Sequence, residues 1–166
     1  GRNCTIMGSN IALLQPKCPE ERIEFTSTRN LFDKMKTWTL QHPNGIIIHA
    51  AAVGDFEVRN TNKGKIVSGS TLTLELYPTP KIVDAIKEWS PNIGLVSFKA
   101  AAPKTPLEDV EQIAQKQLLR TQSDIVFANI LGNLHENVLI LSKIKSEWFS
   151  QRSEGLESLI HRILQW

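Results

Sequence analysis

The chain has 166 residues, of which 41% are hydrophobic, so it is long and apolar enough to bury a core as a single domain. Its 19 Lys and Arg against 17 Asp and Glu give a net charge of +2, which offers no electrostatic case for a nucleic-acid or acidic-membrane partner. No apolar run approaches the length of a membrane span, and the first residues lack the apolar core of a signal peptide.

The two cysteines, Cys4 and Cys18, do not have metal-site spacing. Reduced thiols in a cytoplasmic protein are the simplest interpretation, and a Cys4–Cys18 disulfide is the alternative.

The first part of the chain predicts two short strands and one helix. The strands cover Cys4–Met7 and Arg22–Phe25, with a proline-containing loop between them. The helix follows Thr26-Ser27-Thr28, whose hydroxyls are N-cap candidates, and ends near Gln41. Its apolar residues recur at i, i+4 and i+7 and so form one buried face: Leu31, Met35 and Trp38.

The stretch Ile46–Ile66 carries the strongest functional signal. It begins with a β-branched run that suits a strand covered on both faces, and small side chains follow at residues 49–53. Open α/β sheets bind ligands at the carboxyl ends of strands, where small residues let a ligand approach the backbone. Asp55 and Lys65 then suit a phosphate-bearing ligand. Each residue also has an interpretation without function: the alanines allow helix–sheet packing, Asp55 forms a turn, and Lys65 is a solvated surface charge.

The middle of the chain predicts a loop, a strand and a helix. The polar segment 57–70 is expected to be a flexible loop, acting as a lid, a dimer arm or plain solvated chain. Alternating leucines predict a strand over Thr71–Leu76, and a helix begins at Pro80 with Thr79 as its cap. The expected buried face of this helix consists of Ile82, Val83, Ile86 and Trp89.

The second half repeats the strand-then-alanine design. An apolar strand over Ile93–Phe98 is followed by Lys99 and three alanines, so two neighbouring strand ends are expected to form one crevice. The further predicted elements are a helix over Leu107–Arg120 capped by Thr105, strands over Asp124–Ala128 and Glu136–Leu141, a segment Lys143–Phe149 that extends or pairs with the latter, and a helix over Ser153–Leu164. Alternating strands and helices predict a three-layer, Rossmann-like α/β fold, with a mostly parallel sheet and helices on both faces, in a single domain over 1–166.

Several motifs, in order, resemble the phosphopantothenoylcysteine synthetases, also called phosphopantothenate–cysteine ligases. The motifs are AAAVGDF at 50–56, GKI at 64–66, LEL at 74–76 with TPKIV at 79–83, WSP at 89–91, SFK at 97–99 and FANIL at 127–131. The later motifs look like the eukaryotic-type branch and some monofunctional bacterial members. The resemblance covers nearly the whole chain.

The resemblance implies an amide-forming reaction. In it, 4′-phosphopantothenate and cysteine are joined through an acyl-nucleotidylate, at the expense of ATP or CTP with Mg²⁺. It also implies a homodimer.

The resemblance further implies roles for individual residues. Lys65, Asp55 and Ala51 match catalytic positions, and no protein metal ligand is implied. The nucleotide-binding positions are His49, Ala50, Ala51, Asp55, Lys65, Pro80, Lys81, Ile82, Val83, Phe98 and Lys116. Without the resemblance, each of three residues has a structural explanation. Phe98 packs in the core at a strand end, Lys116 is a solvated surface charge, and His49 is a packed histidine without an acid–base role.

The chain departs from the family at two places. The family's first strand and glycine-rich phosphate loop have no counterpart here, so the domain is expected to be N-terminally incomplete. Either those residues come from a separate N-terminal segment or another chain, or this polypeptide is incomplete as an enzyme. Val67 and Ser68 stand where bacterial bifunctional members tend to have lysines, which leaves the choice between ATP and CTP open.

Two other functions are alternatives to a ligase. One is a non-catalytic, regulatory nucleotide-binding module of the same fold. The other is a dinucleotide-binding reductase domain, which is disfavoured because the chain contains no G-x-G-x-x-G motif.

The missing phosphate loop yields a prediction. The 166-residue chain alone is expected to be a poor catalyst of amide formation while it retains nucleotide binding, because the residues that resemble the nucleotide site are present. Steady-state turnover of the purified chain checks this, and full turnover would contradict it.

Overall fold

The computed structural model describes residues 3–9, 21–58, 64–65, 69 and 71–166. The chain divides into two compact units, each described here by itself. The first unit consists of Gly1–Met35 and Ala52–Lys81, and the second consists of Lys36–Ala51 and Ile82–Trp166. Helix α1 (Thr28–Gln41) begins in the first unit and ends in the second.

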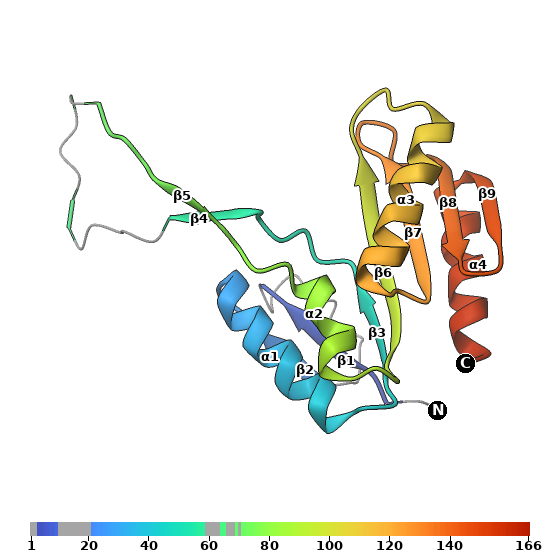
Figure 1. Cartoon of the computed structure of the whole chain (residues 1–166), viewed down its shortest axis with the longest axis horizontal. Coiled ribbons are helices and arrows are strands. Elements are labelled where there is room, and N and C mark those ends of the chain that lie inside the picture. Colours follow the sequence, from blue (N-terminus) through green and yellow to red (C-terminus); the bar gives the residue numbers. More distant parts are fainter. Residues whose placement is uncertain (1–2, 10–20, 59–63, 66–68, 70) are drawn as a thin grey trace. The chain divides into compact units, whose positions relative to one another are not determined.

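The second unit is built on a five-stranded sheet in the order β3-β6-β7-β8-β9 (Figure 1). Three neighbouring strands run parallel: β3 (Ile46–His49), β6 (Gly94–Ala101) and β7 (Ile125–Ile130). The last two, β8 (Glu136–Ser142) and β9 (Ser146–Gln151), are added antiparallel as a hairpin. The segment predicted to extend or pair with β8 therefore pairs with it.

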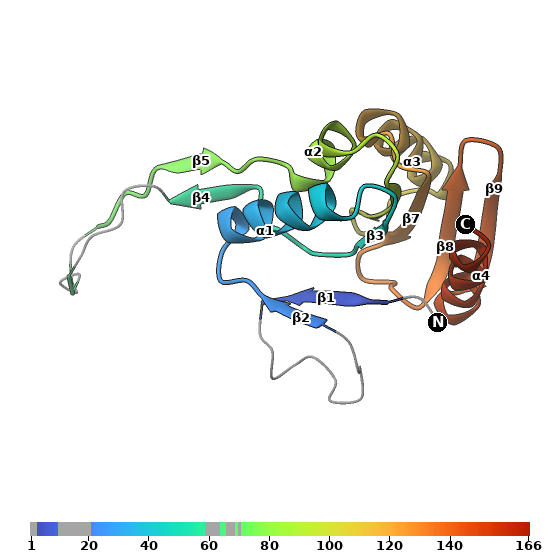
Figure 2. The ribbon, with the colours of Figure 1, turned by 90° about the horizontal axis from the view of Figure 1, so that it is seen from below.

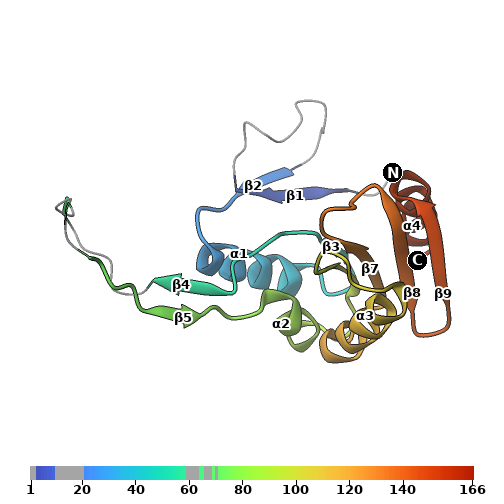
Figure 3. The same ribbon diagram turned by 90° about the horizontal axis from the view of Figure 1, so that it is seen from above.

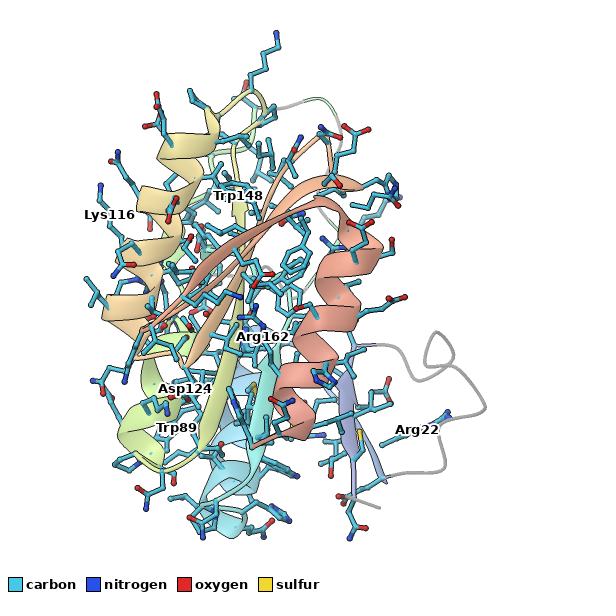
Figure 4. The ribbon with its side chains drawn as sticks, turned by 90° about the vertical axis from the view of Figure 1, so that its right-hand side faces the viewer. Arg22, Trp89, Lys116, Asp124, Trp148 and Arg162 are labelled. Carbon is cyan, nitrogen blue, oxygen red and sulfur yellow. The ribbon has the colours of Figure 1, made fainter. Side chains whose placement is uncertain are left out.

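Helices cover the two faces of this sheet, and β7 shows why, since all six of its residues are buried. Val126 and Ala128 pack on one face in a cluster with α3 (Leu107–Thr121). Ile125 and Phe127 pack on the other in a cluster with α4 (Arg152–Leu164). Because alternate strand residues point to opposite faces, an unbroken apolar strand requires both covers. Figure 4 shows α3 and α4 on opposite sides of the strands, and the predicted three-layer α/β fold is confirmed.

Helix α2 (Ile82–Trp89) is joined to the amino end of β6 by a partly buried ion pair. The Lys87 Nζ donates to Asp124 Oδ2 at 2.8 Å and to the Ile93 carbonyl at 2.6 Å. The same Asp124 oxygen accepts from the Leu95 N–H at 2.8 Å. Charge-assisted hydrogen bonds that satisfy each other in this way compensate for removing both charges from water.

The first unit contains two strand pairs. Strands β1 (Thr5–Gly8) and β2 (Glu21–Glu24) run parallel, with Thr5 opposite Glu21 and Gly8 opposite Glu24 (Figure 2). Strands β4 (Phe56–Val58) and β5 (Leu76–Pro78) form an antiparallel ribbon, with Glu57 opposite Tyr77 (Figure 3).

Two predicted strand boundaries are wrong. The strand expected over Thr71–Leu76 begins only at Leu76, which pairs with Val58 of β4, and continues to Pro78. Strand β6 does not end at Phe98 but continues to Ala101, because β7 pairs with its last residues, up to Ala101 opposite Ile130. Hydropathy alternation marks a strand, but the length of the partner sets where it stops.

The predicted caps are only partly correct. Ser27 accepts the Asn30 N–H at 3.1 Å and caps α1. Thr79 and Thr105 instead donate to the carbonyl oxygens of Gly54 and Ala102, and their helices begin at Ile82 and Leu107. Local hydroxyl-to-backbone bonds of this kind compete with capping.

One side chain of the β-branched run that was predicted to be covered on both faces is exposed, since Ile48 on β3 is 52% exposed. For Ile48 the physical reason is topological, because β3 is an edge strand of its sheet rather than a central strand.

Some predictions concern residues outside the described ranges, namely Cys18, Ile66 and most of the polar loop over 57–70. Cys4 is exposed. Within the described residues, no helix has the length and apolar character needed to cross a bilayer.

The contact of α4 with the sheet yields a stability prediction at Gly155. A Cβ at this position would lie 2.5 Å from Val138 Cγ2 and 3.3 Å from Phe127 Cε2. Gly155→Ala is therefore expected to lower the free energy of unfolding by about 1–3 kcal/mol, the usual cost of overpacking, despite alanine's higher helix propensity. Urea unfolding measures this, with the exposed Glu157→Ala on the same helix as the control. An unchanged or raised midpoint for Gly155→Ala would show that the helix is not seated this closely.

Candidate functional site

The carboxyl end of β3 lies beside the middle of β6 in the second unit. The strands are paired in parallel, with Ile46 opposite Gly94 and His49 opposite Ser97. The exposed residues Ala50 and Ala51 follow β3 at the position where Phe98 continues β6. The residues predicted to end the two strands are therefore neighbours, although β6 itself continues to Ala101. The small, exposed alanines after β3 are of the kind that lets a ligand approach the backbone.

Phe98 is held in place by contacts on its ring and on its backbone. Its ring centroid lies 5.0 Å from that of Phe127, at an interplanar angle of 31°. Its carbonyl oxygen accepts from Gln117 Nε2 at 3.1 Å. The ring remains only partly buried. A partly exposed aromatic ring held in this way is suited to stack on a flat group.

The Gln117 amide belongs to a buried hydrogen-bonded network beneath the strand end. Its Nε2 also donates to Ser97 Oγ at 3.0 Å, and Ser123 Oγ donates to the same oxygen at 2.8 Å. Thr121 Oγ1 lies 2.6 Å from Ser123 Oγ. Because its members bond to one another, we interpret the network as structural support for β6.

The structure separates Lys116 from this network. Lys116 is exposed on α3, on the side turned away from the sheet (Figure 4), and its neighbour Gln117 is the α3 residue that contacts Phe98. At the start of α2, Ile82 is buried and Val83 is partly buried.

The remaining predicted site residues belong to the first unit, where Asp55 lies beside the segment that precedes α2. The Asp55 carbonyl accepts the Thr79 N–H at 2.9 Å, and its Oδ1 lies 3.8 Å from Lys81 Nζ. Both side chains of this pair are largely exposed, so the pair contributes little to stability. Pro80 and Lys65 are exposed as well. This unit therefore brings Asp55, Pro80 and Lys81 together in an accessible position.

His49 is the last residue of β3, and one of its ring nitrogens lacks a hydrogen-bond partner within the described part of the chain. This atom is Nε2, which is buried. Burial lowers the pKa of His49 below its ordinary value, because desolvation disfavours the charged imidazolium, and a hydrogen bond with its own backbone opposes this in part. Burial therefore favours the neutral form of His49 at the end of β3.

Sequence reasoning missed Arg152, which contacts Asn129 at this end of the sheet. Asn129 follows the strand predicted over Asp124–Ala128, but in the structure it lies within β7 and is 6% exposed. With its amide oriented to satisfy both polar atoms, its nitrogen donates to the Lys99 carbonyl at 3.3 Å and its oxygen accepts from Arg152 Nη1 at 3.1 Å. Arg152 opens α4, and a single arginine at a helix start gives no signal in the sequence.

No metal centre is found among the described residues, where no three His, Cys, Asp or Glu side chains are grouped to bind an ion. The chemistry available at the strand ends is thus that of backbone groups, small side chains and an aromatic ring, with separate cationic and anionic side chains in the first unit.

This domain has parallel strands, small residues after one of them and an aromatic ring on its neighbour. Such an arrangement is typical of α/β domains that bind ligands at the carboxyl ends of their strands. The sequence model of the family described as "DNA/pantothenate metabolism flavoprotein C-terminal domain" matches residues 1–154, and the chain belongs to this family. The family relationship predicted from the motifs is confirmed.

Known proteins similar to this chain agree with that assignment. The coenzyme A biosynthesis bifunctional protein CoaBC of Thermococcus kodakarensis is 38% identical over 143 residues, which are 81% of this chain and 35% of the relative. The chain therefore spans about a third of the length of that relative.

Solved structures share the fold. The DNA/pantothenate metabolism flavoprotein from Streptococcus pneumoniae superposes with a TM-score of 0.77 at 24% identity, over 91% of this chain and 75% of the other. A Cab2 mutant in complex with phosphopantothenate-cysteine gives a TM-score of 0.60 at 20% identity, over 85% and 49%.

The lowered pKa of His49 predicts a pH dependence of stability. As the pH falls through the ordinary imidazole pKa, the unfolded chain takes up a proton that the folded chain resists, so stability falls towards acid. The slope due to one such group is at most about 1.4 kcal/mol per pH unit. His49→Gln is expected to flatten the dependence of unfolding free energy between about pH 7.5 and 5.

The exposed His42→Gln is the matched control and should keep the native slope. Identical slopes for the native chain and His49→Gln would mean that His49 is not protected from protonation.

Proposed function

We propose that this chain is the nucleotide-binding part of a ligase that joins 4′-phosphopantothenate to cysteine in coenzyme A biosynthesis. The observation that carries the proposal is the 38% identity to a coenzyme A biosynthesis protein across 81% of the chain. The paired strand ends with their small residues support it, because they match the place where an α/β sheet holds a ligand.

In this proposal the second unit binds the nucleoside triphosphate at the ends of β3 and β6. The Phe98 ring lies against the base, while His49, Ala50 and Ala51 allow the nucleotide close to the backbone. Ile82 and Val83 contribute the free backbone amides of the α2 start, which attract an anion. Lys116 is assigned to the same nucleotide by resemblance, and its exposed position on α3 gives no independent support.

The resemblance assigns the nucleotide four residues of the first unit: Asp55, Lys65, Pro80 and Lys81. The observed Asp55–Lys81 pair is compatible with this, because a lysine held loosely by an exposed carboxylate remains available to a phosphate. Lys65 is proposed to neutralise charge on the phosphates as the reaction proceeds.

The proposed reaction has two steps, and the resemblance assigns catalytic positions to Ala51 and Asp55. The phosphopantothenate carboxylate attacks the α-phosphorus, so an acyl–oxygen–phosphorus bond forms and pyrophosphate leaves. The cysteine amine then attacks the acyl carbon, an amide forms, and the nucleoside monophosphate leaves with the acyl oxygen. Both steps bring anions together, which is why cations and oriented amides are needed.

In this proposal Mg²⁺ enters bound to the nucleotide, as part of the substrate. Among the described residues no three His, Cys, Asp or Glu side chains are grouped to bind an ion, and Mg²⁺ commonly binds through substrate phosphates with few protein ligands. It would offset the phosphate charge, and no residue of this chain is assigned to it.

Two partners belong to the proposal. A further strand, carrying the family's phosphate loop from a separate N-terminal segment, would pair with β3, which supports this as an edge strand with an exposed isoleucine. A homodimer is the second. The exposed apolar side chains of the first unit are a surface that a second copy could cover: Phe56, Leu72, Leu74 and Leu76.

Release of pyrophosphate tests the catalytic proposal. The protein is incubated with ATP or CTP, Mg²⁺ and 4′-phosphopantothenate, first without and then with cysteine. Release that requires phosphopantothenate, followed by cysteine-dependent amide formation, is expected for a ligase that contains this chain. Nucleotide binding without any release, even with the N-terminal segment supplied, would favour the regulatory module instead.

Lys65→Ala is expected to weaken the binding of the nucleoside triphosphate to the chain by about 10-fold or more, because a charge-assisted contact to phosphate is lost. Calorimetric titration with ATP and with CTP in Mg²⁺ measures this and also settles the choice of base. Lys143→Ala, which removes another exposed lysine, is the control and should bind as the native chain does. Equal binding by all three proteins would remove Lys65 from the site.

A further inference from the structure

Arg152, the first residue of α4, makes two contacts at the carboxyl end of the second unit's sheet. Its guanidinium carbon lies 5.3 Å from the centre of the Phe127 ring. With the Asn129 amide in the orientation that satisfies both of its polar atoms, the Arg152 Nη1 donates to the Asn129 side-chain oxygen at 3.1 Å. A guanidinium is planar, so it can stack on an aromatic face and at the same time donate hydrogen bonds from its own edge. An ammonium group has no plane with which to do this.

Both contacts lead to Phe98. Phe127 lies opposite Phe98 in the β6–β7 register, with the ring centroids 5.0 Å apart. The nitrogen of Asn129 donates to the carbonyl of Lys99, the residue after Phe98. Arg152 is thus connected to the Phe98 ring through one neighbour and to the adjoining backbone through another.

An ion-pair role does not account for Arg152. Among the described residues no carboxylate lies within salt-bridge distance of it, whereas Arg162, on the same helix, pairs with Glu147. The two arginines therefore differ in kind. Arg162 joins α4 to β9 through charge, and Arg152 contacts an aromatic ring and a buried amide.

We propose that Arg152 is a positioning residue for the nucleobase. It fixes the amide orientation of Asn129 and the stacked Phe127, and through them holds the Phe98 ring at the angle at which the base of a nucleoside triphosphate stacks. This inference rests on the proposed nucleotide-binding function. It follows from the principle that a binding side chain is effective only when its own rotamer is locked by its neighbours.

The test separates the base from the phosphates. Arg152→Met keeps an unbranched, largely apolar side chain at this position but removes the guanidinium, and with it both the cation over the Phe127 ring and the donor to Asn129. Arg162→Met is the matched control, since it is the same substitution on the same helix. Each variant is titrated calorimetrically with the nucleoside triphosphate that the native chain binds better and with inorganic tripolyphosphate, which has no base.

Arg152→Met is expected to raise the Kd of the nucleotide about tenfold, since loosening a binding group by about an ångström has an effect of at least this size. The Kd of tripolyphosphate should stay within about twofold, as for changes that touch no contact. Arg162→Met should leave both values unchanged within the same limit.

Three outcomes overturn the inference. They are an unchanged nucleotide Kd in Arg152→Met, an equal loss of nucleotide and tripolyphosphate affinity, and an equal effect of Arg162→Met. Arg152→Lys is measured in parallel as a second variant, in case Arg152→Met does not fold. Lysine keeps the positive charge but lacks the planar guanidinium, so Arg152→Lys must also raise the Kd of the nucleotide more than the Kd of tripolyphosphate. Failure of the native chain to bind any nucleotide would instead overturn the proposed function.

Discussion

Parallel pairing of β6 with β3 on one side and β7 on the other is the constraint on which the site depends. Parallel strands end at the same edge of a sheet, so residues distant in sequence meet there without any contact between their side chains being required. The register places His49 opposite Ser97 and Phe98 opposite Phe127. A shift of one residue in either pairing would turn Phe98 to the other face of the sheet.

The pairing is secured at both ends of β6. At the amino end, Asp124 accepts hydrogen bonds from Lys87 and from the Leu95 backbone, which joins α2, β6 and the entry to β7. At the carboxyl end, Gln117 binds the Phe98 carbonyl from the α3 side, and Phe127 contacts its ring within the α4-side cluster. Buried polar bonds of this kind are costly to leave unsatisfied, so they select one register over its alternatives.

The sequence predicts the class of fold and the neighbouring strand ends because both follow from local patterns. Apolar runs followed by alanines identify β3 and β6, and alternation with helices predicts a parallel sheet. Features that depend on distant partners were predicted less well. The end of β6 is set by β7, the exposure of Ile48 by its edge position, and the hydroxyl of Thr79 by the Gly54 carbonyl. Arg152 could not be found at all, because only the folded chain places it beside Asn129.

The first unit raises a different question, because its site residues carry charge rather than shape. Asp55 and Lys81 form an exposed pair whose net effect on stability is small, so stability alone does not explain both residues. In the proposed function these two residues serve ligand binding, because exposed charged side chains can rearrange around phosphates that enter and leave with each turnover.

A crystal structure of the chain with a non-hydrolysable nucleoside triphosphate and Mg²⁺ tests the central claim most directly. The account predicts that the base lies against the ring of Phe98, with the sugar and phosphates along the backbone of Ala50 and Ala51. A nucleotide bound elsewhere on the chain, with the ends of β3 and β6 unchanged and vacant, would contradict it.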